Sequence, residues 1–242
     1  MRIFFALWFR DVLKLVREPS RWFGIVSQPL LFWIVLGTGL GGQFKSNYLQ
    51  YFFPGILLMV ILFSCIFSSM TMIEDRQSGF LKSVLPLTKR RFSILFGKMF
   101  GITTIVFVQI LCLVPLMPLA DVSFLHMNWI AFLATIVLGS FILSSLNLSF
   151  AWVLHSTHAY HGLMSVVLIP FWMMSGAMFP LDKTWMSCFT YFNPMSFIYE
   201  GLSFSMSGGT NGGIIFFKLI VCCVIFILIS VGIISKPSRQ EG

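Results

Sequence analysis

The chain has 242 residues, of which 57% are apolar, 17% aromatic and only 10% charged. Soluble domains carry about 25% charged residues, so this chain lacks the charge that a water-facing surface needs, and it is expected to be an all-helical integral membrane protein. The 16 Lys and Arg exceed the 8 Asp and Glu; in a membrane chain this excess is first a topology signal, and nucleic-acid binding is not expected.

The segment 1–20 predicts a helix that lies in the plane of the lipid headgroups. Within residues 8–18, apolar and aromatic side chains fall on one arc of a helical wheel, and charged side chains fall on the opposite arc. Pro19 ends this amphipathic pattern. The alternative is a tilted cytosolic extension of the first membrane span.

Six uncharged runs are long enough to cross the membrane, because a helix needs about 20 apolar residues to span the hydrocarbon. These runs are residues 22–41, 51–73, 92–116, 128–154, 160–179 and 214–234. The fourth and fifth runs share a long stretch without Asp, Glu, Lys or Arg, and they meet at a turn that contains three histidines. All six are expected to belong to one transmembrane domain, residues 1–242.

The Lys and Arg residues predict the orientation of these spans. With six spans both termini lie on one side of the membrane, and 13 of the 16 cations fall on that side. Lys45, Lys183 and Lys218 fall on the other side. Because positive charge accumulates in cytoplasmic segments, both termini are expected in the cytoplasm.

The segment 180–206, between the fifth and sixth spans, predicts a pair of short helices that dip into the outer leaflet. Each apolar half is too short to span, and Asn193 and Pro194 separate the two halves. Glu200 lies in the second half, where an unpaired carboxylate is costly, so it is expected to pair with an outer lysine or to reach the surface. These three residues are candidates for an outer gate; the alternative is an interfacial segment without such a role.

The segment 74–91 is the second cytoplasmic connection and predicts a short helix that lies against a partner. It opens with two acids and an Arg, contains one glycine and ends in a basic cluster. Motifs here and elsewhere are Glu74-x-x-x-x-Gly79-Phe80-Leu81, Gly97-Lys98, Arg17-x-Pro19, Tyr51-x-x-Pro54-Gly55 and Asn193-Pro194. In these motifs the chain resembles type-2 ABC exporter permeases over essentially its whole length.

The resemblance implies a bacterial plasma-membrane exporter in which two permease copies, identical or different, each dock onto one cytosolic ATPase subunit. The residues that the resemblance implies in ATPase coupling are Glu74, Asp75, Arg76, Gly79, Leu81 and Arg91. The chain departs from the family pattern at Pro86, which follows Gly79 earlier than usual. This departure affects the register in which the ATPase would dock.

No cofactor is expected in this chain, and it is not expected to be an enzyme. Gly97-Lys98 is followed by Met99, so these residues do not complete a phosphate-binding loop. ATP and Mg are therefore expected on the partner subunit. Ion-driven transport is not favoured either, because no Asp or Glu lies in the middle of any predicted span.

The expected substrate is hydrophobic or amphipathic, such as a drug-like compound, a lipid or a lipid-linked glycan, because nothing charged lines the spans to favour an ion. Candidate residues for an apolar translocation cavity are Phe32, Phe63, Phe67, Phe171 and Phe179. Each of them has lipid or core contact as its alternative. The start Arg17-Glu18-Pro19 resembles drug-resistance and nodulation-factor exporters more than polysaccharide exporters.

A function of a different class would be that of an ATP-independent scaffold or an intramembrane enzyme. An enzyme needs a nucleophile with a base, or a metal cluster, at one depth. His155, His158 and His161 are the candidates for a metal site. On a regular helix their rings fan too widely for one clean site, so polar turn residues are the preferred interpretation and no metal is expected.

The charge distribution predicts the accessibility of three positions. In a cysteine-free background, Lys45→Cys and Lys183→Cys should react with a membrane-impermeant thiol reagent in intact cells, and Arg90→Cys should react only after the cells are permeabilised. Labelling of the third variant in intact cells would invert the predicted topology.

Overall fold

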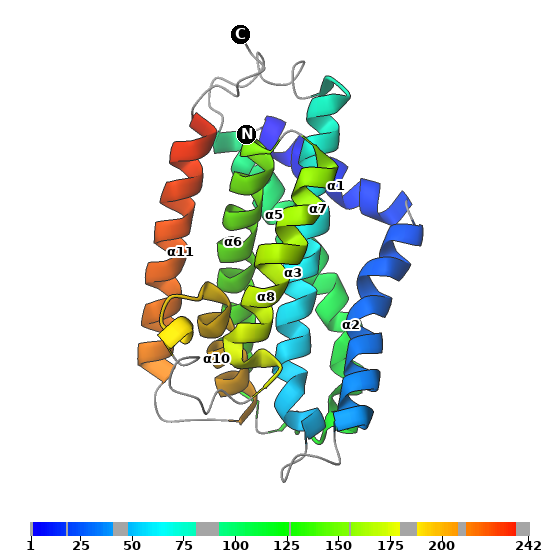
Figure 1. Cartoon of the computed structure of the whole chain (residues 1–242), viewed down its shortest axis with the longest axis vertical. Helices are drawn as coiled ribbons and strands as arrows, with labels where there is room; N and C mark the ends of the chain where they lie inside the picture. The colour runs from blue at the N-terminus through cyan, green and yellow to red at the C-terminus, as the bar shows by residue number, and fades with distance from the viewer. Residues whose placement is uncertain are drawn as a thin grey trace.

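The structure is a computed structural model that describes residues 2–17, 19–40, 48–80, 92–125, 127–154, 156–179, 188–207 and 212–235. Within these ranges every regular element is helical, as predicted, and no strand occurs. Figure 1 shows long helices that stand side by side, with α1 (Arg2–Arg17) crossing one end of the bundle. The location of α1 in the headgroup plane stays a prediction.

The remaining elements follow in chain order. They are α2 (Pro19–Leu40), α3 (Tyr48–Gln77), α5 (Phe92–Leu113), η2 (Val114–Ala120), α6 (Trp129–Val153), α7 (Thr157–Leu163), η3 (Met164–Leu168), α8 (Ile169–Trp172), η4 (Met173–Ala177), α10 (Pro194–Ser207) and α11 (Gly212–Ser235).

Four helical stretches in the described part of the chain are long and apolar enough to cross a membrane. They are Tyr48–Gln77, Phe92–Ala120, Trp129–Val153 and Gly212–Ser235. The chain is thus a membrane protein with several apolar helices, while the count of six spans stays a prediction. The predicted fifth span differs from a regular helix, because it is divided among α7, η3, α8 and η4.

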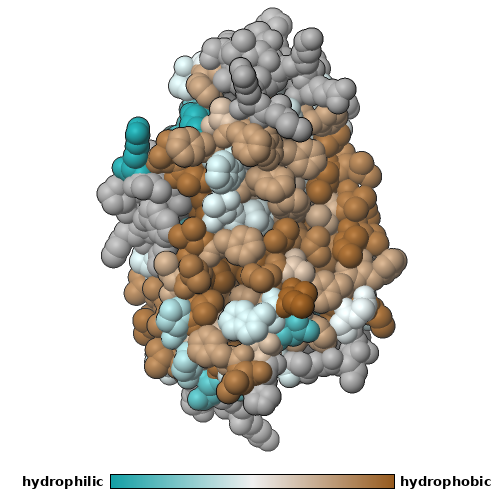
Figure 2. All heavy atoms as spheres, turned by 180° about the vertical axis from the view of Figure 1, so that it is seen from behind, coloured by the Kyte–Doolittle hydropathy of each residue, from teal (hydrophilic) through white to brown (hydrophobic). Residues whose placement is uncertain are grey.

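The centre of the bundle is α3, which packs against α2, α5, α6 and α10. In its most apolar stretch 89% of the residues are buried, compared with 22% in α11. The exposed side chains of α11 are large and apolar, and Figure 2 shows apolar side chains over most of the face seen from behind. Such a surface suits contact with lipid rather than with water.

Local hydrogen bonds mark the start of α6 and the start of α7. Asn128 Oδ1 accepts a hydrogen bond from Ala131 N at 3.1 Å and begins α6, and Leu154 returns to extended backbone after it. Ser156 Oγ then accepts from Ala159 N at 3.1 Å, which caps α7. These caps satisfy amide groups that a helix start leaves unpaired.

Two π-helical turns, η3 and η4, interrupt the stretch from α7 onward, and Gly176 in the second has a φ of 84°. Tyrosines of α3 bond to carbonyl groups near this break: the Tyr48 hydroxyl donates to Met178 O at 2.9 Å, and the Tyr51 hydroxyl donates to Gly176 O. A Cβ on Gly55 would lie 2.4 Å from Ala177 O, so only glycine permits this close crossing.

The predicted outer helix pair is described in part. Its second helix corresponds to α10, and residues 188–190 form one helical turn before it. Residues 180–187 lie outside the described ranges. The insertion of the pair into the outer leaflet stays a prediction.

Candidate functional site

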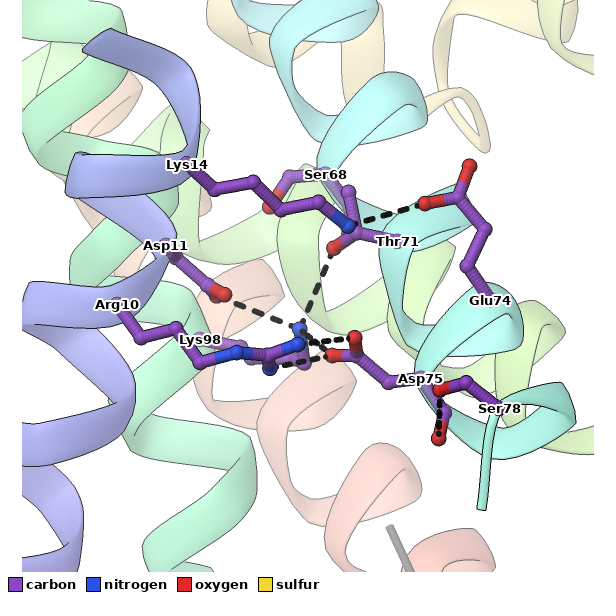
Figure 3. A network of polar contacts seen from close by, with 9 residues as sticks. All are labelled: Arg10, Asp11, Lys14, Ser68, Thr71, Glu74, Asp75, Ser78 and Lys98. Atoms are coloured by element: carbon purple, nitrogen blue, oxygen red, sulfur yellow. Dashed lines mark hydrogen bonds and ion pairs between the residues drawn. The ribbon is translucent and has the colours of Figure 1, made fainter. Parts of the chain in front are cut away.

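Six charged side chains meet at the end of the bundle that α1 crosses (Figure 3). They come from three helices: α1 contributes Arg10, Asp11 and Lys14, α3 contributes Glu74 and Asp75, and α5 contributes Lys98. Three of them are cations and three are carboxylates. We call these six residues the ion network.

Lys98 lies at the centre of the ion network and is only 1% exposed. Its Nζ lies 3.3 Å from Asp11 Oδ2, 3.4 Å from Asp75 Oδ2 and 3.4 Å from Thr71 Oγ1. Both carboxylates are buried as well. A buried ammonium is tolerated only when it is paired and hydrogen-bonded, and Lys98 meets this condition by joining α1 to α3.

Arg10 binds Asp75 with both arms of its guanidinium group. Nη1 lies 2.8 Å from Oδ2, and Nη2 lies 2.5 Å from Oδ1. The hydrogen bond to Asp75 is the largest cause that raises the pKa of Arg10 above its usual value. The guanidinium carbon also lies 3.8 Å from the centre of the Phe80 ring, so Arg10 contacts the residue that follows the turn after α3.

Lys14 and Glu74 form the more exposed edge of the ion network. Lys14 Nζ lies 3.1 Å from Glu74 Oε2, and the Glu74 side chain is 41% exposed. Glu74 is therefore the member of the predicted coupling set that combines a contact to α1 with a carboxylate open to a partner.

Arg76 is buried and bonds to the end of α6 instead of joining the ion network. Nη1 donates to Trp152 O at 2.8 Å, and Nη2 donates to Leu154 O at 2.8 Å and to Ala151 O. These carbonyl groups lie at the helix end that lacks backbone partners. Arg76 thus caps the C-terminal end of α6, where a positive charge interacts favourably with the helix dipole.

Gly79 ends the α3 region with a φ of 76°, a conformation that glycine adopts at little cost. Its N–H donates to Arg76 O at 3.1 Å. Leu81 and Arg91, the other predicted coupling residues, lie outside the described residues.

Asp75 and Arg76 have partners within the chain. The resemblance implied that both take part in ATPase coupling, and in the structure their charged groups bind other helices of the same chain. Sequence analysis did not place Arg10, Asp11 or Lys98 in a site. The available signal was a lone lysine near the start of an apolar run, together with the polar arc of the first helix.

The predicted gate residues have contacts at the opposite end of the bundle. Asn193 Nδ2 donates to Phe171 O at 2.6 Å, and its Oδ1 accepts from Met195 N at 3.0 Å, so it caps α10 at Pro194. Lys218 Nζ lies 3.5 Å from Glu200 Oε2. This pair is one of the two arrangements expected for the Glu200 carboxylate.

The five candidate cavity phenylalanines have different environments. Phe63 is 3% exposed and belongs to the core of this chain, which is the alternative given for it above. Phe67 is half-buried, and its ring centre lies 6.3 Å from that of Phe63. Phe32 and Phe171 are exposed, and Phe179 is half-buried.

The histidine turn carries no metal geometry in the part of the chain that the structure describes. His158 and His161 are exposed, and His155 lies outside that part. Among the described residues no group of three or more His, Cys, Asp or Glu could hold a metal ion.

Sequence comparison matches residues 2–207 to the protein family described as ABC-2 type transporter. The chain belongs to this family. The match covers the ion network, α3 and α10, so both ends of the bundle described above lie within the ABC-2 type transporter region. Membership makes the chain a transport permease, and proteins of this family work with an ATPase subunit.

Relatives of this ABC-2 type transporter carry the name "Putative transport permease ycf38". The protein of Cyanophora paradoxa is 29% identical over 223 aligned positions, which cover 84% of this chain and 73% of the relative. The protein of Porphyra purpurea is 28% identical over 214 positions, with the same coverage of both chains.

The ion network predicts that Lys98→Met is strongly destabilising. The substitution leaves two buried carboxylates without their shared cation, which should cost about 3–5 kcal/mol of folding free energy. Thermal unfolding of the protein in detergent, followed by size-exclusion chromatography, measures the loss.

Lys218→Met is the matched control, because the pair with Glu200 is about 40% exposed and should contribute about 1 kcal/mol or less. Adding Asp11→Asn to Lys98→Met should recover part of the stability. Equal unfolding midpoints for Lys98→Met and Lys218→Met would contradict the burial argument.

Proposed function

We propose that the chain is the membrane-spanning subunit of an ATP-driven exporter for hydrophobic or amphipathic compounds. Two such chains would work with two copies of a cytosolic ATPase that binds ATP and Mg, in a bacterial plasma membrane with both termini cytoplasmic. The observation that carries the proposal is the ion network, since it joins three helices at the start of the predicted coupling segment 74–91. Family membership supports the ATPase partner.

The ion network gives this segment a route to the membrane spans. Asp75 binds Arg10 of α1 and Lys98 of α5 at once, so a push on the segment would move α1, α3 and α5 together. Arg76 extends the connection to α6. A rigid-body tilt of these helices would open the path toward the outer side.

The outer gate in this mechanism is α10 with the helix break beside it. Asn193 bonds to Phe171 O, and the Glu200–Lys218 pair joins α10 to α11. Neutral hydrogen bonds and a half-exposed ion pair hold the closed state weakly enough for an ATP-driven tilt to break them.

The coupling role predicts that Glu74→Ala and Gly79→Pro uncouple the ATPase while the permease still folds. Each change should lower the permease-dependent stimulation of ATP hydrolysis roughly tenfold, the scale of one lost charge-assisted contact. Hydrolysis is measured on the tagged chain purified with its ATPase and reconstituted in liposomes.

Glu74→Asp keeps the charge and Gly79→Asn tolerates positive φ, so both controls should stay near wild type. Full stimulation in Glu74→Ala and in Gly79→Pro would remove segment 74–91 from the mechanism. Purification of a lone chain with bound metal would instead support the intramembrane enzyme.

The gate role predicts that Glu200→Ala and Lys218→Ala have the same effect. Loss of the pair should raise basal ATP hydrolysis and dye leak from liposomes about two- to fivefold, as expected for a half-exposed ion pair. Glu200→Gln should fall between wild type and Glu200→Ala. Wild-type leak and hydrolysis in both alanine variants would leave α10 as an interfacial helix without a gating role.

A further inference from the structure

A pocket of about 660 Å³ lies at the end of α3 that is far from the ion network. Its walls come from the start of α3, the turn after η2 and the second half of α10. The polar and aromatic residues of its lining include Gln50, Tyr51, Asp121, Ser123, Tyr199 and Ser203. We call it the outer pocket. Its volume lies in the range of about 300–1,000 Å³ that small-molecule sites have.

The outer pocket and the ion network lie at opposite ends of α3. From Tyr51 to Asp75 the helix α3 rises about 36 Å, at about 1.5 Å per residue. This distance matches a hydrocarbon core of about 30 Å together with part of the interfacial region on each side. In the orientation proposed above, with the ion network at the cytoplasmic side, the pocket would lie at the side where an exported compound leaves.

The aromatic part of the outer pocket is held in a fixed arrangement. The rings of Tyr51 and Tyr199 lie 6.0 Å apart at an angle of 63°. The Tyr199 hydroxyl donates to Tyr51 O at 3.3 Å, and the Tyr51 hydroxyl donates to Gly176 O. Val122 and Met206 add buried apolar surface to the lining. Rigid rings beside an apolar surface fit the C–H face of a sugar with little loss of freedom.

The polar part of the outer pocket is neutral except for one carboxylate. Gln50, Ser123 and Ser203 carry groups that both donate and accept hydrogen bonds, as sugar hydroxyls do, and Asp121 can accept from two hydroxyls. Asp121 is exposed. Its backbone N–H donates to Met117 O and Pro118 O, and these hydrogen bonds fix the turn that carries Asp121. No described residue of the lining is a cation, so an anionic headgroup would meet only a carboxylate.

We propose that the outer pocket binds a neutral, polyhydroxylated headgroup, such as the sugar of a glycolipid or of a lipid-linked glycan. The proposal rests on the proposed export function, because it names the class of amphipathic substrate that the chain releases. An organic cation fits less well, since the two rings meet edge to face and do not form a cage of ring faces. With an organic cation bound, the neutral hydrogen-bonding groups of the outer pocket would have no partner on the ligand.

The test measures headgroup preference without the ATPase. The full chain in phosphatidylcholine nanodiscs is titrated with hexyl maltoside, hexyltrimethylammonium and hexyl phosphate, which share one tail, and binding is followed by saturation-transfer NMR. We expect saturable binding of the maltoside, at least roughly tenfold tighter than binding of the other two. Equal affinity for the three probes, or a preference for the ammonium or the phosphate, would overturn the proposal.

Variants assign the binding to the outer pocket. Tyr199→Ala and Asp121→Asn should each weaken maltoside binding roughly tenfold, and Tyr199→Phe, which keeps the ring, should stay near wild type. Tyr191→Ala is the matched control outside the lining, at a side chain that is 72% exposed. Ser203→Leu should reduce binding by filling the pocket, and unfolding midpoints show which variants stay folded.

Unchanged maltoside binding in folded Tyr199→Ala, Asp121→Asn and Ser203→Leu would overturn the proposal. Failure of this inference is separable from failure of the export function. Wild-type coupling to the ATPase without maltoside preference contradicts the outer pocket alone. Maltoside binding without any ATPase coupling contradicts the export function and leaves the outer pocket as a sugar site.

Discussion

Lys98 is buried at one end of an apolar bundle, and this burial determines how the helices around it must be placed. A cation that water does not reach needs charged partners, and neither neighbouring turns of α5 nor lipid can provide them. Asp11 and Asp75 meet this need from two other helices. The position of α1 across the bundle end follows, because only there can Asp11 reach Lys98. The ion network therefore fixes α1 relative to α3 and α5.

Three consecutive residues at the end of α3 bind three different neighbours. Successive side chains on a helix point about 100° apart, and here Glu74 contacts Lys14, Asp75 contacts Lys98, and Arg76 contacts the end of α6. One helical turn thus holds α1, α5 and α6 to the most buried helix of the chain. The end of α3 is therefore joined to most of the bundle through few contacts.

Sequence patterns predicted the parts of the structure that local chemistry controls. Asn128 and Leu154, the predicted ends of one span, flank α6, because a cap and an uncharged run are both local features. The π-helical turns around Gly176 were not predictable, since tyrosine bonds from α3 accompany the break. The partners of Lys98 were not predictable either, because Asp11 is far away in sequence and becomes a partner only through tertiary packing.

The two ends of α3 differ in the kind of interaction that holds them. Ion pairs join the helices at the end that α1 crosses, and removing one buried partner costs about 3–5 kcal/mol. At the other end Tyr48 and Tyr51 bond to backbone carbonyl groups, and such neutral bonds contribute about 0.5–1.5 kcal/mol each. Water or a polar headgroup can replace these bonds as the helices separate. Separating the helices beside the outer pocket should therefore cost less free energy than separating them at the ion network.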